Sequence, residues 1–226
     1  MKHFFPLLAL LLVLSAFPLH AGAPMVQQPI SSFVERYAAM EEALVKRMSD
    51  ETLWQGPAGK PVVLECLRAA GVLRSKAAVP LLIRHVDYTP RFDLLDYYQT
   101  PLQDPDATYP VVKVLREIGQ PAVQPILERM MLIDHAEPHN PDRVQLEREM
   151  QQWRLDQIRF ARLAEALAGI FGDGTYSGGS IGKALARERI RFEAEKHTGK
   201  PRENLLNALR MPSLGSSEEG EPGKAH

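Results

Sequence analysis

Two histidines four residues apart are the first residues whose spacing could support chemistry. His135 and His139 have the spacing that places two metal ligands on one face of a helix. Asp134 and Glu137 stand beside them. Pro138 interrupts a continuous helix, and a zinc site needs three or four protein ligands, of which no third is evident nearby. We therefore interpret this stretch as an exposed polar loop, and we expect neither a metal nor a cofactor.

The glycine-rich run from Gly172 to Ser180 is the second candidate, because glycine-rich loops bind phosphate groups. A phosphate loop follows a strand and ends in Gly-Lys-Ser or Gly-Lys-Thr at the start of a helix. Here a helix is expected before the run, and Gly182-Lys183 is followed by Ala184. The run is therefore interpreted as a connection between helices. The chain also lacks the Gly-x-Ser-x-Gly, His-Glu-x-x-His and Cys-x-x-Cys motifs, so we predict no catalytic residue.

Two arginines are candidates for binding rather than catalysis. Arg84 and Arg129 occupy equivalent places in an internal repeat. Stacked guanidinium groups could bind an acidic peptide or a phosphate. The alternative is a solvated face whose arginines pair with nearby acids. Carboxylate catalysis needs two groups that converge in a cleft, which sequence spacing cannot show, so the acidic neighbours Glu41 and Glu42 are interpreted as solvated.

An aromatic cluster lies in the long connection at 87–108, which joins the two repeat units. It includes Phe92, Tyr97 and Tyr98. Aromatic side chains are enriched in the cores of protein interfaces, so these residues are the stronger candidates for contact with a protein partner. Local packing against neighbouring helices is the alternative.

The sequence segments that position these residues form an internal repeat. Shifting residues 61–86 by 45 places superimposes them on 106–131 without a gap, and Pro80 then meets Pro125. Apolar residues recur where apolar residues stood. A period of about 40–47 residues is typical of stacked helix pairs. The apolar spacing predicts helices over about 32–54, 61–73, 76–86, 109–118, 122–133, 143–171, 181–196 and 201–209.

The repeat resembles a known family. Residues 115–125, Leu-Arg-Glu-Ile-Gly-Gln-Pro-Ala-Val-Gln-Pro, resemble the consensus of HEAT repeats in the form called PBS-lyase-like. Residues 70–82 match more loosely, with Arg74 in place of the turn glycine, and 163–173 suggest a third unit. The resemblance implies an all-α fold, a short solenoid of HEAT-like helix pairs with capping helices. This architecture hosts binding proteins, assembly factors and a few enzymes.

The two ends of the chain differ in composition from the rest. Residues 1–23 have a basic start, an apolar run and an Ala-Gly-Ala motif, which together are typical of a secretory signal peptide. Cleavage after Ala21 or after Ala23 is expected. Residues 24–211 form the HEAT-like domain, and 212–226 are expected to be a disordered tail. The chain holds 27 Lys and Arg against 28 Asp and Glu, a balance that gives no support to nucleic-acid binding.

These patterns together predict an exported protein, periplasmic or extracellular, that binds an unknown protein partner without catalysing a reaction. Once the signal is removed, no segment is apolar enough to span a membrane. The single cysteine, Cys66, cannot form an intramolecular disulfide and is expected to be a small buried residue. Two alternatives stay open: a lyase or isomerase acting on a tetrapyrrole, as the family label implies, and a structural subunit of an envelope complex.

Overall fold

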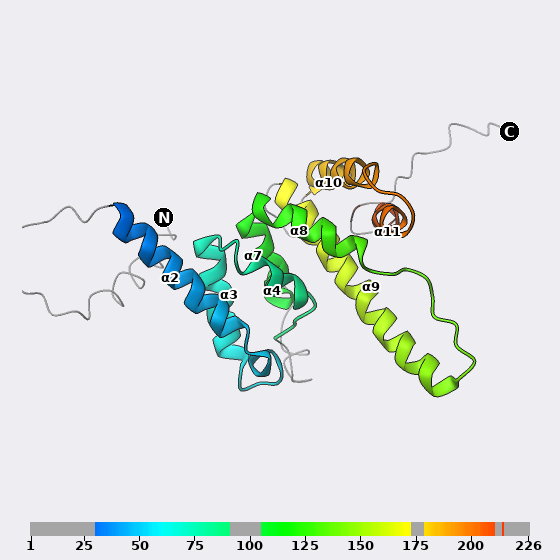
Figure 1. The fold of residues 1–226 in the computed structure, drawn as a ribbon, viewed down its shortest axis with the longest axis horizontal. Helices are drawn as coiled ribbons and strands as arrows, with labels where there is room; N and C mark the ends of the chain where they lie inside the picture. Colours follow the sequence, from blue (N-terminus) through cyan, green and yellow to red (C-terminus); the bar gives the residue numbers. More distant parts are fainter. Residues whose placement is uncertain (1–29, 91–104, 173–178, 211–213, 215–226) are drawn as a thin grey trace, which may run out of the picture. The chain divides into compact units, whose positions relative to one another are not determined.

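The computed structural model describes residues 30–90, 105–172, 179–210 and 214. Within these ranges every regular element is a helix (Figure 1), so the predicted all-α class is confirmed. The chain divides into two compact units, residues 1–37 and 38–226. The described residues of the first unit belong to the start of helix α2, and the contacts reported below lie within the second unit.

The helices follow the apolar spacing closely. Six of the eight predicted helices begin and end within two residues of an observed one. The observed elements are α2 (Ile30–Met48), the 3-10 helix η1 (Glu51–Trp54), α3 (Lys60–Leu73), α4 (Val79–Arg84), α6 (Pro105–Thr108), α7 (Pro110–Ile118), α8 (Gln120–Met131), α9 (Arg143–Phe171), α10 (Gly179–Ala194) and α11 (Lys200–Ala208). The two exceptions are the helices predicted at 32–54 and 76–86.

The helix predicted at 32–54 is interrupted at Asp50. The Asp50 side chain accepts hydrogen bonds from the backbone N–H of Thr52 at 3.1 Å and from its hydroxyl at 2.6 Å. Such local bonds compete with the helical pattern, so α2 stops at Met48 and η1 starts a new turn. Trp54 then folds back, and its indole N–H donates to the Met48 carbonyl at 2.8 Å.

The helix predicted at 76–86 is shorter than expected, because capping bonds hold its first residues in a turn. Ser75 Oγ accepts from the Ala78 N–H at 3.2 Å. Glu41 Oε1 in turn accepts from the Ser75 hydroxyl at 2.6 Å and from the Ala77 N–H at 3.2 Å. The interpretation of Glu41 as a solvated acid is therefore wrong: its carboxylate joins α2 to the start of α4.

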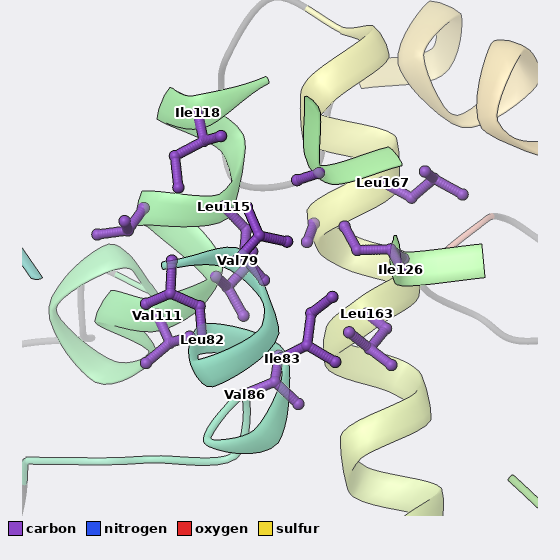
Figure 2. Packing of buried hydrophobic residues seen from close by; sticks show 14 of the residues in the cluster. Val79, Leu82, Ile83, Val86, Val111, Leu115, Ile118, Ile126, Leu163 and Leu167 are labelled. Atoms are coloured by element: carbon purple, nitrogen blue, oxygen red, sulfur yellow. The ribbon is translucent and has the colours of Figure 1, made fainter. Parts of the chain in front are cut away.

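The repeat units pack through one apolar core. Helix α7 contacts α3 on one side and α9 on the other, while α4 contacts α7 and α8. Figure 2 shows Ile83 and Leu115 near Ile126 and Leu163 in this core. Four leucines that the apolar spacing places in the core are each at most 2% exposed: Leu67, Leu82, Leu115 and Leu127. The stacking of these pairs into a solenoid stays a prediction.

The turns within the two repeat units use left-handed backbone. Gly119, between α7 and α8, has a φ of 77°, which glycine adopts without steric penalty. At the equivalent turn between α3 and α4, Arg74 has a φ of 48° and ends α3. A left-handed residue there is the usual end of a helix, although glycine is the usual residue. The turn therefore forms even though Arg74 stands where the repeat consensus has glycine.

Helix α9 is buried over only part of its length. Its buried residues run from Phe160 to Gly169, where α7, α8 and α10 pack against it. The apolar spacing that predicts this helix would give a buried stripe along its whole length, which is wrong for part of its first half, since Val144, Leu155 and Ile158 are exposed. Instead, the connection from α8 runs along the first half of α9, as Figure 1 shows. Leu214, the large apolar residue of the expected tail, is also buried, and the rest of 212–226 lies outside the described residues.

Candidate functional site

A groove of about 350 Å³ lies between α3 and α7. One face of each helix forms a wall: residues 64–72 of α3 and 110–117 of α7. Its lining consists of Leu64, Leu67, Arg68, Val72, Pro90, Asp106, Pro110, Lys113, Val114 and Glu117. A groove of this size and mainly apolar lining would hold a small ligand or a few side chains of a peptide.

The two helices approach closely at Gly71. A Cβ atom at this position would lie 2.0 Å from Glu117 Oε2. The glycine therefore leaves space for the Glu117 side chain to lie across α3. Glu117 Oε1 is 4.0 Å from Lys113 Nζ one turn earlier on α7. This arrangement places one acid and one base side by side at the edge of the groove.

The charges of the groove are not fully matched. Asp106 pairs with the guanidinium of Arg116, which is buried, and Lys113 lies beside Glu117. Arg68 is exposed on α3 and forms no ion pair with any described carboxylate. The groove therefore presents one cation that a ligand carboxylate could pair with.

Two arginines of α9 contact the described ends of the connection at 87–108, from which Pro90 and Asp106 line the groove. Arg159 Nε donates to Asp87 Oδ2 at 3.1 Å, before the connection. Three residues later along α9, the guanidinium of Arg162 lies 3.5 Å from the centre of the Tyr109 ring, after the connection. Arg162 also donates to Glu165 at 2.6 Å. One turn of α9 thus fixes both points where the connection leaves and rejoins the core.

An aromatic cluster supports the start of the same connection. The Trp54 and His85 rings stack with centroids 4.0 Å apart and planes 5° apart, and Tyr88 meets the Trp54 ring edge-on at 5.2 Å. Glu51 Oε2 lies 3.3 Å from His85 Nε2, without the alignment of a hydrogen bond. Burial lowers the pKa of His85, which keeps the imidazole neutral near pH 7.

The predicted binding residues differ in their exposure and in the partners that they already have. Arg84 is exposed and donates to Glu51 at 2.9 Å, so part of its binding capacity is already used. Arg129 is half-buried on α8. Phe92, Tyr97 and Tyr98 lie outside the described residues. The residues on either side of them, however, include Pro90 and Asp106, which line the groove.

Sequence reasoning missed the groove itself. A signal was present in Val72, an apolar residue that falls off the apolar stripe formed by Val63, Leu67 and Ala70 on α3 and is 73% exposed. Arg68, one turn before it on the same helix, also lies off that stripe. Neither residue could be assigned to a groove without knowing that α7 packs beside α3.

The interpretation of the stretch at 134–142 as an exposed loop is wrong at His135, and most of the glycine-rich run lies outside the described residues. His135 is half-buried, with Nδ1 2.7 Å from Gln157 Oε1 and its ring 4.2 Å from the ring of Phe160. His139 is exposed, and the described residues contain no cluster of three or more His, Cys, Asp or Glu that could hold a metal. Cys66 is buried, as predicted, and burial raises the pKa of its thiol.

Acidification should destabilise the protein through two histidines. Burial lowers the pKa of both His85 and His135 below 6.5. The unfolded chain therefore binds more protons below about pH 6.5 than the folded chain does, and the free energy of unfolding falls as the pH falls through this range. Urea unfolding between about pH 7.5 and about pH 5.5 measures the slope.

Matched histidine variants identify the source of this slope. Replacing His85 and His135 with glutamine should flatten it, whereas His139→Gln should leave it unchanged because His139 is exposed. Charged neighbours also shift the pKa of His85: it is raised by Glu51 and Asp87 and lowered by Arg84 and Arg159. A slope that persists in the double variant would assign the pH dependence to other groups.

Among the described helices, none has the length and apolar character that crossing a bilayer requires. Comparisons of the chain with protein-family models, with curated proteins and with solved structures found no match.

Proposed function

We propose that this chain is an exported, non-enzymatic binding protein of the HEAT-like type. It holds a segment of another protein in the groove between α3 and α7, next to the connection at 87–108. The observation that carries this proposal is the groove itself: a mainly apolar lining with one unmatched cation, Arg68, at its edge. The signal-like residues 1–23 and the repeat spacing support the export and the architecture in this proposal.

The composition of the groove favours a particular kind of partner. Leu64, Leu67 and Val114 supply apolar surface for one or two aliphatic or aromatic side chains. Asp106 is already paired with Arg116, so it adds little unbalanced negative charge. An extended peptide that carries an apolar residue next to Asp or Glu would fill the groove and pair with Arg68.

Arg159 and Arg162 of α9, called the clamp below, support the location. Because they contact both described ends of the connection, we propose that the aromatic residues between those ends come within reach of the groove. Phe92, Tyr97 and Tyr98 would then extend the contact surface beyond the groove. This arrangement joins the aromatic candidates from the sequence to a surface with defined walls.

Peptide selection tests the proposal directly. A phage-displayed peptide library selected on the purified protein should give peptides in which an apolar residue neighbours Asp or Glu. Arg68→Glu should weaken the binding of a selected peptide about tenfold, because attraction to its carboxylate becomes repulsion. Fluorescence anisotropy of the labelled peptide measures the change.

The matched control is Arg202→Glu on α11. Arg202 is exposed and lies outside the groove, so this variant has the same change of charge and should bind the peptide as the unsubstituted protein does. Equal binding to the Arg68→Glu variant would show that the peptide sits elsewhere. Visible absorbance in the purified protein would favour the tetrapyrrole alternative instead.

A further inference from the structure

The first half of α9, residues 143–158, has one face with no partner among the described residues. Val144, Leu155 and Ile158 are 62%, 43% and 46% exposed. At 100° per residue these three positions fall within an arc of about 60° on the helix. Arg148 and Gln151 lie between them on the same face and are also exposed. This face, residues 144, 148, 151, 155 and 158, is called the α9 outer face below.

The opposite face of the same helix half is already covered. Trp153 Nε1 donates to the His135 carbonyl at 3.4 Å, and Gln157 Nε2 donates to the Asp134 carbonyl at 3.0 Å. Asn140 Nδ2 donates to Glu149 at 3.0 Å. These bonds fasten the connection at 134–142 along the helix. The helix half is therefore held in place on one side while its α9 outer face is left open.

The α9 outer face has the spacing of a helix-pairing seam. Positions 144, 148, 151, 155 and 158 alternate steps of four and three residues, which is the pattern by which two helices interlock. The seam is apolar at both ends, with Val144 at one and Leu155 and Ile158 at the other. Its middle is polar, with Arg148 and Gln151.

The charges beside the seam are complementary to those of an antiparallel copy. Glu147 and Arg154 lie two turns apart along one edge of the seam, both exposed, and neither forms an ion pair with a described residue. Arg154 has no acidic residue three or four places away with which to pair along its own helix. Two antiparallel copies would place Glu147 of each beside Arg154 of the other, and the pair would occur twice by symmetry.

The same register matches two of the three apolar residues. With residue 144 opposite residue 155 of the second copy, Val144 meets Leu155 twice, and Arg148 meets Gln151 twice. A parallel pair would instead bring Arg148 against Arg148 and lose the contacts between Glu147 and Arg154. The polar middle therefore selects the antiparallel register, as single polar residues do in coiled coils.

From this pattern we propose that the α9 outer face docks a second copy of this chain, and that two chains form an antiparallel dimer through residues 143–158 of α9. The dimer leaves the groove between α3 and α7 outside the interface, since no groove residue belongs to α9. The protein would then present two grooves at once, and a partner with two matching segments would be held by both. The dimer does not depend on the function proposed for the groove.

Charge exchange tests the dimer. Sedimentation velocity of the purified protein should show a species with twice the mass of the 25.3 kDa chain. Glu147→Arg and Arg154→Glu should each weaken the dimer about tenfold, because each replaces two attractive pairs with two repulsive ones. The double variant E147R/R154E should restore the dimer, since it exchanges the two charges and rebuilds both pairs.

Two controls separate the interface from folding and from net charge. Circular dichroism should show equal helix content in all variants, because both positions are exposed. Glu195→Arg, directly after the end of α10, changes the net charge by the same amount as Glu147→Arg at another exposed position and should leave the dimer intact. Leu155→Asp should abolish the dimer by placing a charge in the seam.

Three results would overturn the proposal. The first is a monomer at every concentration that stays soluble. The second is a dimer that the single charge variants and Leu155→Asp leave unchanged, which would place the interface elsewhere. The third is a double variant no tighter than either single variant, which would show that Glu147 and Arg154 do not meet across the dimer.

Discussion

Replacing Leu115 with alanine should lower the free energy of unfolding by about 3 kcal/mol. Leu115 lies on α7, the helix that contacts α3, α4, α8 and α9, and its side chain is 0% exposed. Removing it leaves a cavity where several helices meet, and such cavities collapse only in part. Urea unfolding should show a lower midpoint with an unchanged slope, and the melting temperature should fall by about 6–12 °C.

Leu132→Ala is the matched control for Leu115→Ala. Leu132 follows the last turn of α8 and is 73% exposed, so the same change of chemistry should alter stability by no more than about 0.5 kcal/mol. A loss at Leu115 as small as the loss at Leu132 would mean that α7 does not unite the repeat units in one core. The inference that the units share a core would then fail.

The helical core could be predicted from the sequence because the repeat encodes it twice. The shift of 45 places aligns apolar residues that are indeed buried in both units, such as Leu82 and Leu127. Side-chain burial on one face of a helix follows directly from spacing. The bounds of α3 and α7 followed for the same reason, and in the structure each helix has a proline in its first turn.

The structure differs from the sequence prediction where a residue far away in sequence supplies a hydrogen bond. The start of α4 depends on Glu41, which lies on α2 and accepts from the Ser75 hydroxyl. No local pattern links these two residues. The exposure of Val144 and Leu155 likewise depends on which neighbours α9 has, since their spacing alone fits a buried stripe.

The candidate site, like the fold, could be predicted from the sequence only in part. The aromatic connection was visible as a break in the repeat, but the groove beside it was not. Its walls form only when α3 and α7 lie side by side. In the sequence, nothing distinguishes Arg159 and Arg162 from the other charged residues of a long helix, although both hold the connection. Their partners Asp87 and Tyr109 are each more than fifty positions away.

Gly182→Ala should destabilise the protein by about 2 kcal/mol, against the usual effect of this change in a helix. In an open helical position, alanine is more stable than glycine by about 1 kcal/mol. Gly182 lies in α10, where a Cβ atom would stand 2.5 Å from the Ala168 carbonyl oxygen and 2.7 Å from Gly172 Cα. Both are backbone atoms at the end of α9, so relief requires moving one helix away from the other.

Ala184→Gly gives the comparison on the same helix. Ala184 is exposed, so its replacement should follow propensity alone and lower stability by about 1 kcal/mol. Gly182→Ala and Ala184→Gly are opposite substitutions two residues apart, and both should destabilise the protein. Helix propensity by itself cannot produce this result. Thermal unfolding of the two variants checks this, and a gain in stability from Gly182→Ala would mean that α9 and α10 are not in close contact. The close contact matters for function because α9 carries both the clamp on the connection and the face proposed to bind a second copy.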